Sequence, residues 1–70
     1  MRILVVNPNT TRSMTEKIGA AARAVAAPAS EIDAVSPEMG PASIEGYYDE
    51  AFAVPGLVEE VRKGEARGYD

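Results

Sequence analysis

The stretch MRILVVNPNTT, residues 1–11, decides how the rest of the sequence is read. Its run from Ile3 to Val6 is apolar and mostly β-branched, which is typical of a parallel strand buried on both faces. Pro8 ends the run, because proline cannot donate to a ladder of backbone hydrogen bonds. The stretch therefore predicts a strand over residues 2–6, followed by a turn rich in asparagine and threonine.

A helix is predicted after this turn, over residues 11–27. Its apolar face is formed by residues that recur at spacings of three and four: Met14, Ile18, Ala21, Ala22 and Val25. The candidate caps are Asn9, Thr10, Thr11 and a capping box of Ser13 with Glu16. Gly19 costs the helix roughly 1 kcal/mol relative to alanine. Together with the alanines, it makes the helix smooth enough to pack close to a sheet.

The second half of the chain repeats the order of strand and helix. Residues 31–35 predict a strand whose partial alternation of polar and apolar residues suits the edge of a sheet. After a loop with two prolines and a glycine, a helix is predicted over residues 44–67. Pro55 lies inside it and lacks the N–H that would bond the carbonyl of Ala51, so the helix must kink or restart there.

The order β-α-β-α defines the fold class, which is α/β. The two strands start about 29 residues apart, as in a βαβ unit, and a second such step puts a third strand just after residue 70. We therefore expect residues 1–70 to be an incomplete amino-terminal α/β domain of a doubly wound, parallel-sheet (flavodoxin-like) protein. On this expectation, the remainder of the domain is absent from the chain.

Composition excludes several classes of function. The net charge of −4 disfavours contact with the phosphates of nucleic acids. No apolar run approaches the ~20 residues that a membrane helix needs, and no signal peptide is recognisable. The absence of cysteine and histidine excludes a disulfide and disfavours zinc. We expect a cytoplasmic protein that binds a small molecule and neither nucleic acid nor membranes.

Two loops are expected at one edge of the sheet, because ligands bind beyond the carboxyl ends of parallel strands. They are residues 7–11 and 36–43. The first leads into a helix N-terminus, whose free N–H groups and dipole favour an anion or a developing oxyanion. The candidate contacts to a small polar ligand are Asn7, Asn9, Thr10 and Ser43. The ordinary alternative is a proline turn and a helix cap without a ligand, with Ser43 as a plain N-cap.

The two loops contain no cysteine, histidine or lysine, so no residue is a credible nucleophile or strong base. No catalytic residue is predicted. The sequence also lacks the glycine patterns of phosphate-binding and dinucleotide-binding loops. Tyr47 and Tyr48 are most simply core and boundary aromatics, and the alternative is that one of the two faces the pocket. The acidic residues Asp49, Glu50, Glu59 and Glu60 are interpreted as a solvated face.

Two segments together resemble a known family: VVNPNTTRSMTEKI, residues 5–18, and MGPASIEGYYDEAFAVPGLVEEVRKGEARG, residues 39–68. They resemble the start of hydantoin racemases, in the aspartate/glutamate/hydantoin racemase family. The resemblance implies two similar α/β domains with the ligand between them, and neither cofactor nor metal. It also implies two cysteines, one per domain. One thiolate removes the proton from the acidic carbon of the substrate, and the other thiol delivers a proton to the opposite face.

The chain departs from this family pattern because it contains no cysteine. The resemblance places both cysteines beyond residue 70, so we expect no racemase activity from the chain alone. Asn7 stands where glutamate racemases have an acidic residue, and an amide there can only orient or hydrogen-bond. Asn9, Thr10 and Ser43 lie in loops that border the pocket in the family.

The sequence thus predicts the amino-terminal part of a cofactor-independent racemase of 5-substituted hydantoins, homo-oligomeric in its full-length form. Within the family, the alternative is an allantoin racemase or an aspartate- or glutamate-type racemase. Outside it, the alternative is a non-catalytic small α/β module that dimerises through its open sheet edge.

Overall fold

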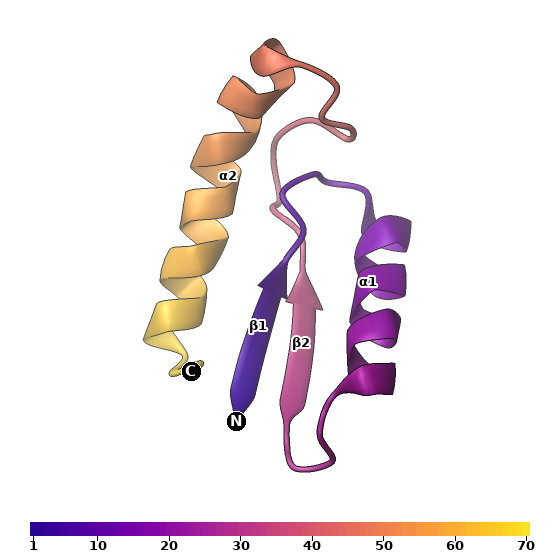
Figure 1. Ribbon diagram of the computed structural model, residues 1–70. Coiled ribbons are helices and arrows are strands. Elements are labelled where there is room, and N and C mark those ends of the chain that lie inside the picture. The colour runs from indigo at the N-terminus through magenta and orange to yellow at the C-terminus, as the bar shows by residue number, and fades with distance from the viewer.

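The computed structural model describes residues 1–70 and contains two strands and two helices in alternation (Figure 1). Strand β1 comprises Arg2–Val6 and strand β2 comprises Glu31–Val35, at the residues predicted from the apolar runs. The strands pair in parallel, with a register that runs from Arg2 opposite Glu31 to Val6 opposite Val35. The α/β fold class is therefore confirmed.

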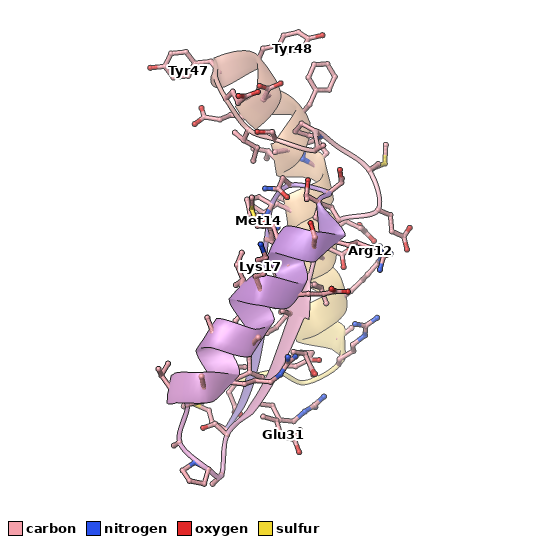
Figure 2. The ribbon with its side chains drawn as sticks, turned by 90° about the vertical axis from the view of Figure 1, so that its right-hand side faces the viewer. Arg12, Met14, Lys17, Glu31, Tyr47 and Tyr48 are labelled. Carbon is pink, nitrogen blue, oxygen red and sulfur yellow. The ribbon has the colours of Figure 1, made fainter.

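The two helices cover opposite faces of this sheet. Helix α1, Arg12–Val25, packs on the face of Ala34, where a Cβ added at Gly19 would lie 2.9 Å from the Ala34 Cβ. Helix α2, Tyr47–Ala66, packs on the other face, where Gly64 contacts Leu4, the residue paired with Asp33. A view from the side shows α1 in front of the sheet and α2 behind it (Figure 2).

Helix α1 begins at Arg12, and its N-cap is Thr11, one of the caps considered above. The capping box of Ser13 with Glu16 is wrong, because Ser13 already lies inside the helix. The helix ends at Val25, before the predicted residue 27, and Ala26 is extended. Pro28 accounts for the exclusion of Ala27 from the helix, since the residue that precedes a proline disfavours helical backbone angles.

Helix α2 continues through Pro55 as one element. The predicted alternative in which the helix ends and restarts at this proline is therefore wrong. The helix begins at Tyr47 rather than residue 44, with Gly46 as N-cap, and the assignment of Ser43 as N-cap is wrong. The side chain that reaches back over the first turn is Asp49, whose Oδ2 accepts a 3.0 Å hydrogen bond from the Glu45 N–H. The positive end of the helix dipole also stabilises an acidic group in the first turn.

The first turns of α2 extend beyond the ends of the strands, where no sheet covers them (Figures 1 and 2). As a result, Tyr47 is 91% exposed, Tyr48 77% and Phe52 57%, so the interpretation of the two tyrosines as core and boundary residues is wrong. The rings of Tyr48 and Phe52 contact each other with centroids 4.8 Å apart. Neither helix is both long and apolar enough to span a bilayer.

Candidate functional site

The loops that follow the two strands lie against each other at the carboxyl edge of the sheet (Figure 1). The Thr10 N–H donates a 3.0 Å hydrogen bond to the carbonyl of Pro41. The Thr11 hydroxyl donates a 2.6 Å hydrogen bond to the carbonyl of Ala42. The start of α1 is thereby joined to the loop between β2 and α2, as the rule for parallel strands predicts.

Asn7 is buried directly after β1, with 5% of its surface exposed. Its N–H continues the ladder by donating to the carbonyl of Val35 at 2.9 Å. Its side-chain Nδ2 donates two 3.0 Å hydrogen bonds, one to Oδ1 of Asn9 and one to Oγ1 of Thr15. Both amide hydrogens of Asn7 are therefore engaged inside the chain.

Asn9 turns the backbone from β1 into α1. Its Oδ1 accepts the bond from Asn7 and a second one, 3.0 Å long, from the N–H of Thr11. Its Nδ2 lies 3.3 Å from the sulfur of Met14. Asn7 and Asn9 thus form the turn and support the helix cap. This role corresponds to the alternative of a proline turn and a helix cap, and it does not depend on a ligand.

Thr15 completes this hydrogen-bond network, and its role was not predicted from the sequence. It is 6% exposed, accepts from Asn7, and donates a 3.3 Å hydrogen bond to the carbonyl of Thr11. The available signal was its helical spacing, because Thr15 is three residues before Ile18 on the side of α1 that faces the sheet. A buried hydroxyl next to two asparagines indicates a polar network rather than a capping site.

Several donors at the same edge have no acceptor within the chain. The first-turn N–H groups of Arg12 and Ser13 make no backbone or side-chain hydrogen bond, and neither does the hydroxyl of Thr10. Thr10 is half-buried, whereas Ser43 is exposed and its hydroxyl is also unpaired. These groups are able to bind a carbonyl or carboxylate oxygen, and the dipole of α1 adds positive potential there.

A buried carboxylate, Glu60, faces the loop after β2 from helix α2. Only 8% of Glu60 is exposed, so its assignment to a solvated face is wrong. The Lys63 ammonium lies 3.1 Å from Glu60 and 3.8 Å from Glu38. The hydrogen bond to Glu60 raises the pKa of Lys63, and the nearby negative charges of the glutamates act in the same direction. A cavity of about 320 Å³ adjoins these residues.

The sequence contained a signal for the burial of Glu60. The buried residues of α2 are Ala53, Gly56, Glu60 and Gly64, which follow one another at helical spacings. Three of the four are small, so the glutamate on that stripe faces the protein. The chain brings no three His, Cys, Asp or Glu side chains together in a cluster able to hold a metal.

Comparison with known proteins gives consistent matches over the whole chain. A family model for Asp/Glu/Hydantoin racemase matches residues 3–70. A hydantoin racemase of Pseudomonas sp. (strain NS671) is 56% identical over 70 residues, which are 100% of this chain and 28% of that protein. The structure of an allantoin racemase from Klebsiella pneumoniae superimposes with a TM-score of 0.97 at 58% identity, over 100% of this chain and 29% of that chain.

A second allantoin racemase, from Pseudomonas fluorescens, gives a TM-score of 0.84 at 44% identity, over 100% of this chain and 28% of that chain. The chain thus spans less than a third of the length of each relative. The match includes both loops at the carboxyl edge and the helices that follow them. The chain belongs to the Asp/Glu/hydantoin racemase family.

Proposed function

We propose that residues 1–70 form one wall of the substrate pocket in a cofactor-independent racemase that inverts 5-substituted hydantoins. In this proposal they are the amino-terminal part of the first of two α/β domains. The supporting observation is the contact between the loops after β1 and β2, in a chain that matches racemases over its full length. The substrate lies against this edge of the sheet, between the two domains.

The reaction breaks the C–H bond at the acidic ring carbon of the hydantoin, and the electron pair moves to the neighbouring carbonyl oxygen. A proton returned to the opposite face restores the carbon with inverted configuration. The developing oxyanion needs donors that are already in place. The unpaired N–H groups of Arg12 and Ser13 and the hydroxyl of Thr10 are suitable donors, because they lie at the positive end of α1.

The four predicted site residues divide into two pairs in this proposal. Asn7 and Asn9 hold the loop through their mutual hydrogen bond and orient it for the ligand. Thr10 and Ser43 have unpaired hydroxyls and contact the substrate directly. The two proton-transfer groups are cysteines outside this chain, which itself has none. The chain alone is therefore inactive.

Allantoin is the second candidate substrate, since both solved structures that match the chain are allantoin racemases. Allantoin is itself a hydantoin with a ureido group at the acidic ring carbon, so the two candidates share one reaction. They differ in whether the pocket accepts an apolar or a polar substituent.

The test is a chimera in which these 70 residues replace the matched part of the Pseudomonas hydantoin racemase, to which they are 56% identical. We expect the chimera to racemise 5-benzylhydantoin, followed by polarimetry, and allantoin serves as the competing substrate. Thr10→Val and Ser43→Ala should lower kcat/KM. Ser30→Ala, at the opposite end of the sheet, is the matched loss of a hydroxyl and should have no effect.

Two results would contradict the proposal. One is an unchanged kcat/KM in the Thr10 and Ser43 variants, provided that circular dichroism shows the chimera to be folded. The other is racemisation of either substrate by the 70-residue chain on its own, which would exclude proton transfer by cysteines.

A further inference from the structure

The segment Pro55-Gly56-Leu57 belongs to the stretch that resembles racemases, but it has no role in the proposed function so far. Pro55 and Gly56 lie inside α2, and Gly56 is buried. A glycine in a helix interior is less favourable than alanine, so a close contact is the expected reason for it. That contact is made by the loop after β2, residues 36–43.

The loop passes directly over the backbone of α2 at Gly56. A Cβ added at Gly56 would lie 2.7 Å from the carbonyl oxygen of Met39 and 2.8 Å from the Cβ of Pro37. Neither obstacle can rotate away, because one is a backbone carbonyl and the other is a proline ring. Any side chain in place of Gly56 would therefore displace the loop from the helix.

A second glycine makes the same approach from the side of the loop. Gly40 has a φ of 128°, a conformation that residues with a side chain rarely adopt. A Cβ added to it would lie 3.5 Å from the carbonyl oxygen of Phe52 and 4.0 Å from Cγ2 of Thr10. The loop is therefore thin where it passes between α2 and Thr10.

An ion pair also joins the loop to α2, but it contributes less. Nζ of Lys63 lies 3.8 Å from Oε1 of Glu38, whose side chain is 83% exposed. Exposed pairs contribute little to stability, because water screens the charges and both side chains lose freedom. The close approach at Gly56 is consequently the main determinant of how near the loop lies to the helix.

The far side of the same loop is joined to the start of α1. The carbonyl of Pro41 accepts the 3.0 Å hydrogen bond from the Thr10 N–H, and the carbonyl of Ala42 accepts the 2.6 Å bond from the Thr11 hydroxyl. Ser43 follows directly. A displacement of the loop would therefore move Ser43 relative to Thr10 and the first N–H groups of α1.

We propose that Gly56 is a positioning residue that seats the loop after β2 at the depth where Thr10 and Ser43 contact the same substrate. The inference rests on the proposed function, which assigns these hydroxyls to the substrate, and it gives α2 a part in their geometry. Donors to an oxyanion act within narrow limits of distance, and a misplacement of about 1 Å can cost about a hundredfold in rate. Gly56 itself acts only through the loop.

The test is Gly56→Ala in the racemase chimera, with 5-benzylhydantoin as substrate. The methyl group should shift the loop by roughly half an ångström, because non-bonded carbon atoms prefer separations of about 3.5 Å. We expect kcat per folded molecule to fall by about tenfold and KM to change by less than about threefold. A purely structural role would lower the folded fraction, measured by circular dichroism, and leave kcat per folded molecule unchanged.

Amide hydrogen exchange in the same chimera gives a readout that needs no activity. The Thr10 N–H is bonded to the carbonyl of Pro41, so it should exchange about tenfold faster or more when the loop is displaced. The Asn7 N–H, which donates to the carbonyl of Val35 beside the sheet, is the internal reference and should not change.

Gly64→Ala is the matched control, because it adds the same methyl group to the same helix. Its Cβ would meet the side chain of Leu4 and not the loop. We expect this variant to be less stable, with kcat per folded molecule and Thr10 exchange unchanged. Gly40→Ala approaches the contact from the loop and leaves the helix intact, so it should reproduce both effects of Gly56→Ala.

Two results would overturn the inference. One is exchange of the Thr10 amide in Gly56→Ala at the rate of the unsubstituted chimera. The other is an unchanged kcat per folded molecule in a chimera that racemises its substrate. A folded, unsubstituted chimera that racemises neither substrate would contradict the proposed function instead, and Thr10 exchange would still decide whether Gly56 seats the loop.

Discussion

The hydroxyl of Tyr69 donates a 2.5 Å hydrogen bond to Oδ2 of Asp33 and thereby fastens the segment after α2 to β2. Arg2 supports the contact, because its guanidinium carbon lies 4.6 Å from the centroid of the Tyr69 ring. The same guanidinium donates to the carbonyl of Arg67 at 2.9 Å. These contacts hold Asp70 beside β1, where its N–H donates to the carbonyl of Arg2 at 2.8 Å.

The bond to Asp33 raises the pKa of Tyr69 above its ordinary value of 10.0, because the protonated phenol is the donor. Since the folded-state pKa is the higher one, the contribution to stability is complete below pH 10 and is lost as the pH rises from there through the folded-state pKa. We expect Tyr69→Phe to lower the thermal midpoint at pH 7 and to lower it less at pH 11. Tyr47→Phe, at an exposed ring without contacts to the sheet, is the control. An equal loss at both pH values would contradict the assigned bond.

The two buried asparagines should differ in their response to the same substitution. Asn7→Asp removes both donors and places a carboxylate against Oδ1 of Asn9, at a cost of about 1–3 kcal/mol or more at neutral pH. Asn9→Asp keeps the acceptor that the Thr11 N–H and Asn7 use, beside a helix N-terminus, and should be nearly neutral. Urea denaturation measures both variants. A similar cost for the two would show that the amide orientations are assigned incorrectly.

Gly19→Ala tests the close approach of α1 to the sheet. Alanine improves helix propensity by roughly 1 kcal/mol, but its Cβ would lie 2.9 Å from that of Ala34, and overpacking costs about 1–3 kcal/mol. We expect a net loss of stability. The reference is Ala20→Gly on the exposed side of the same helix, where only propensity acts and the alanine form is the more stable. A gain from Gly19→Ala would mean that α1 moves away from the sheet at little cost.

Lys63 balances the buried carboxylate of Glu60, so Lys63→Met should destabilise the chain at pH 7. The hydrogen bond to Glu60 raises the pKa of Lys63 above its ordinary value of 10.5. The stabilisation is therefore complete below that pH and lost as the pH rises through the folded-state value. The difference in the free energy of unfolding between wild type and variant, measured by urea denaturation, should disappear at high pH. Lys17→Met removes a lysine without an ion pair and should have no effect. A difference in the free energy of unfolding that persisted at high pH would show that Lys63 stabilises the chain by packing and not by its charge.

The positions of both strands could be predicted because their apolar patterns are local. A continuous run in residues 3–6 and a partial alternation in residues 31–35 each specify a strand, and the helix between them requires a parallel pair. The meeting of the two loops at one edge of the sheet also follows from that topology. The helix ends were less certain, since Gly46 and Asp49 form the start of α2 rather than Ser43.

The signal for the burial of individual helix residues is the periodicity of the whole helix and not a local run of apolar residues. Glu59 and Glu60 are adjacent and chemically identical, yet only Glu60 packs against the protein, beside Lys63. Tyr47 and Tyr48 occupy positions on the apolar face of the predicted helix. Both are exposed, because the sheet is too short to cover them. Periodicity tells which residues share a face of a helix, and the relative lengths of strand and helix determine which part of that face is covered.

By itself, the stretch MRILVVNPNTT determined a buried strand, its end at Pro8 and a polar turn into a helix. Only the tertiary structure decided what the turn does with its side chains. Asn7 and Asn9 bond each other and reach Thr15, eight residues after Asn7, while Thr10 and the first N–H groups of α1 remain unpaired. The physical reason is that a strand pattern depends on neighbours in the sequence. A hydrogen bond between amides depends instead on how closely β1 and α1 pack in space.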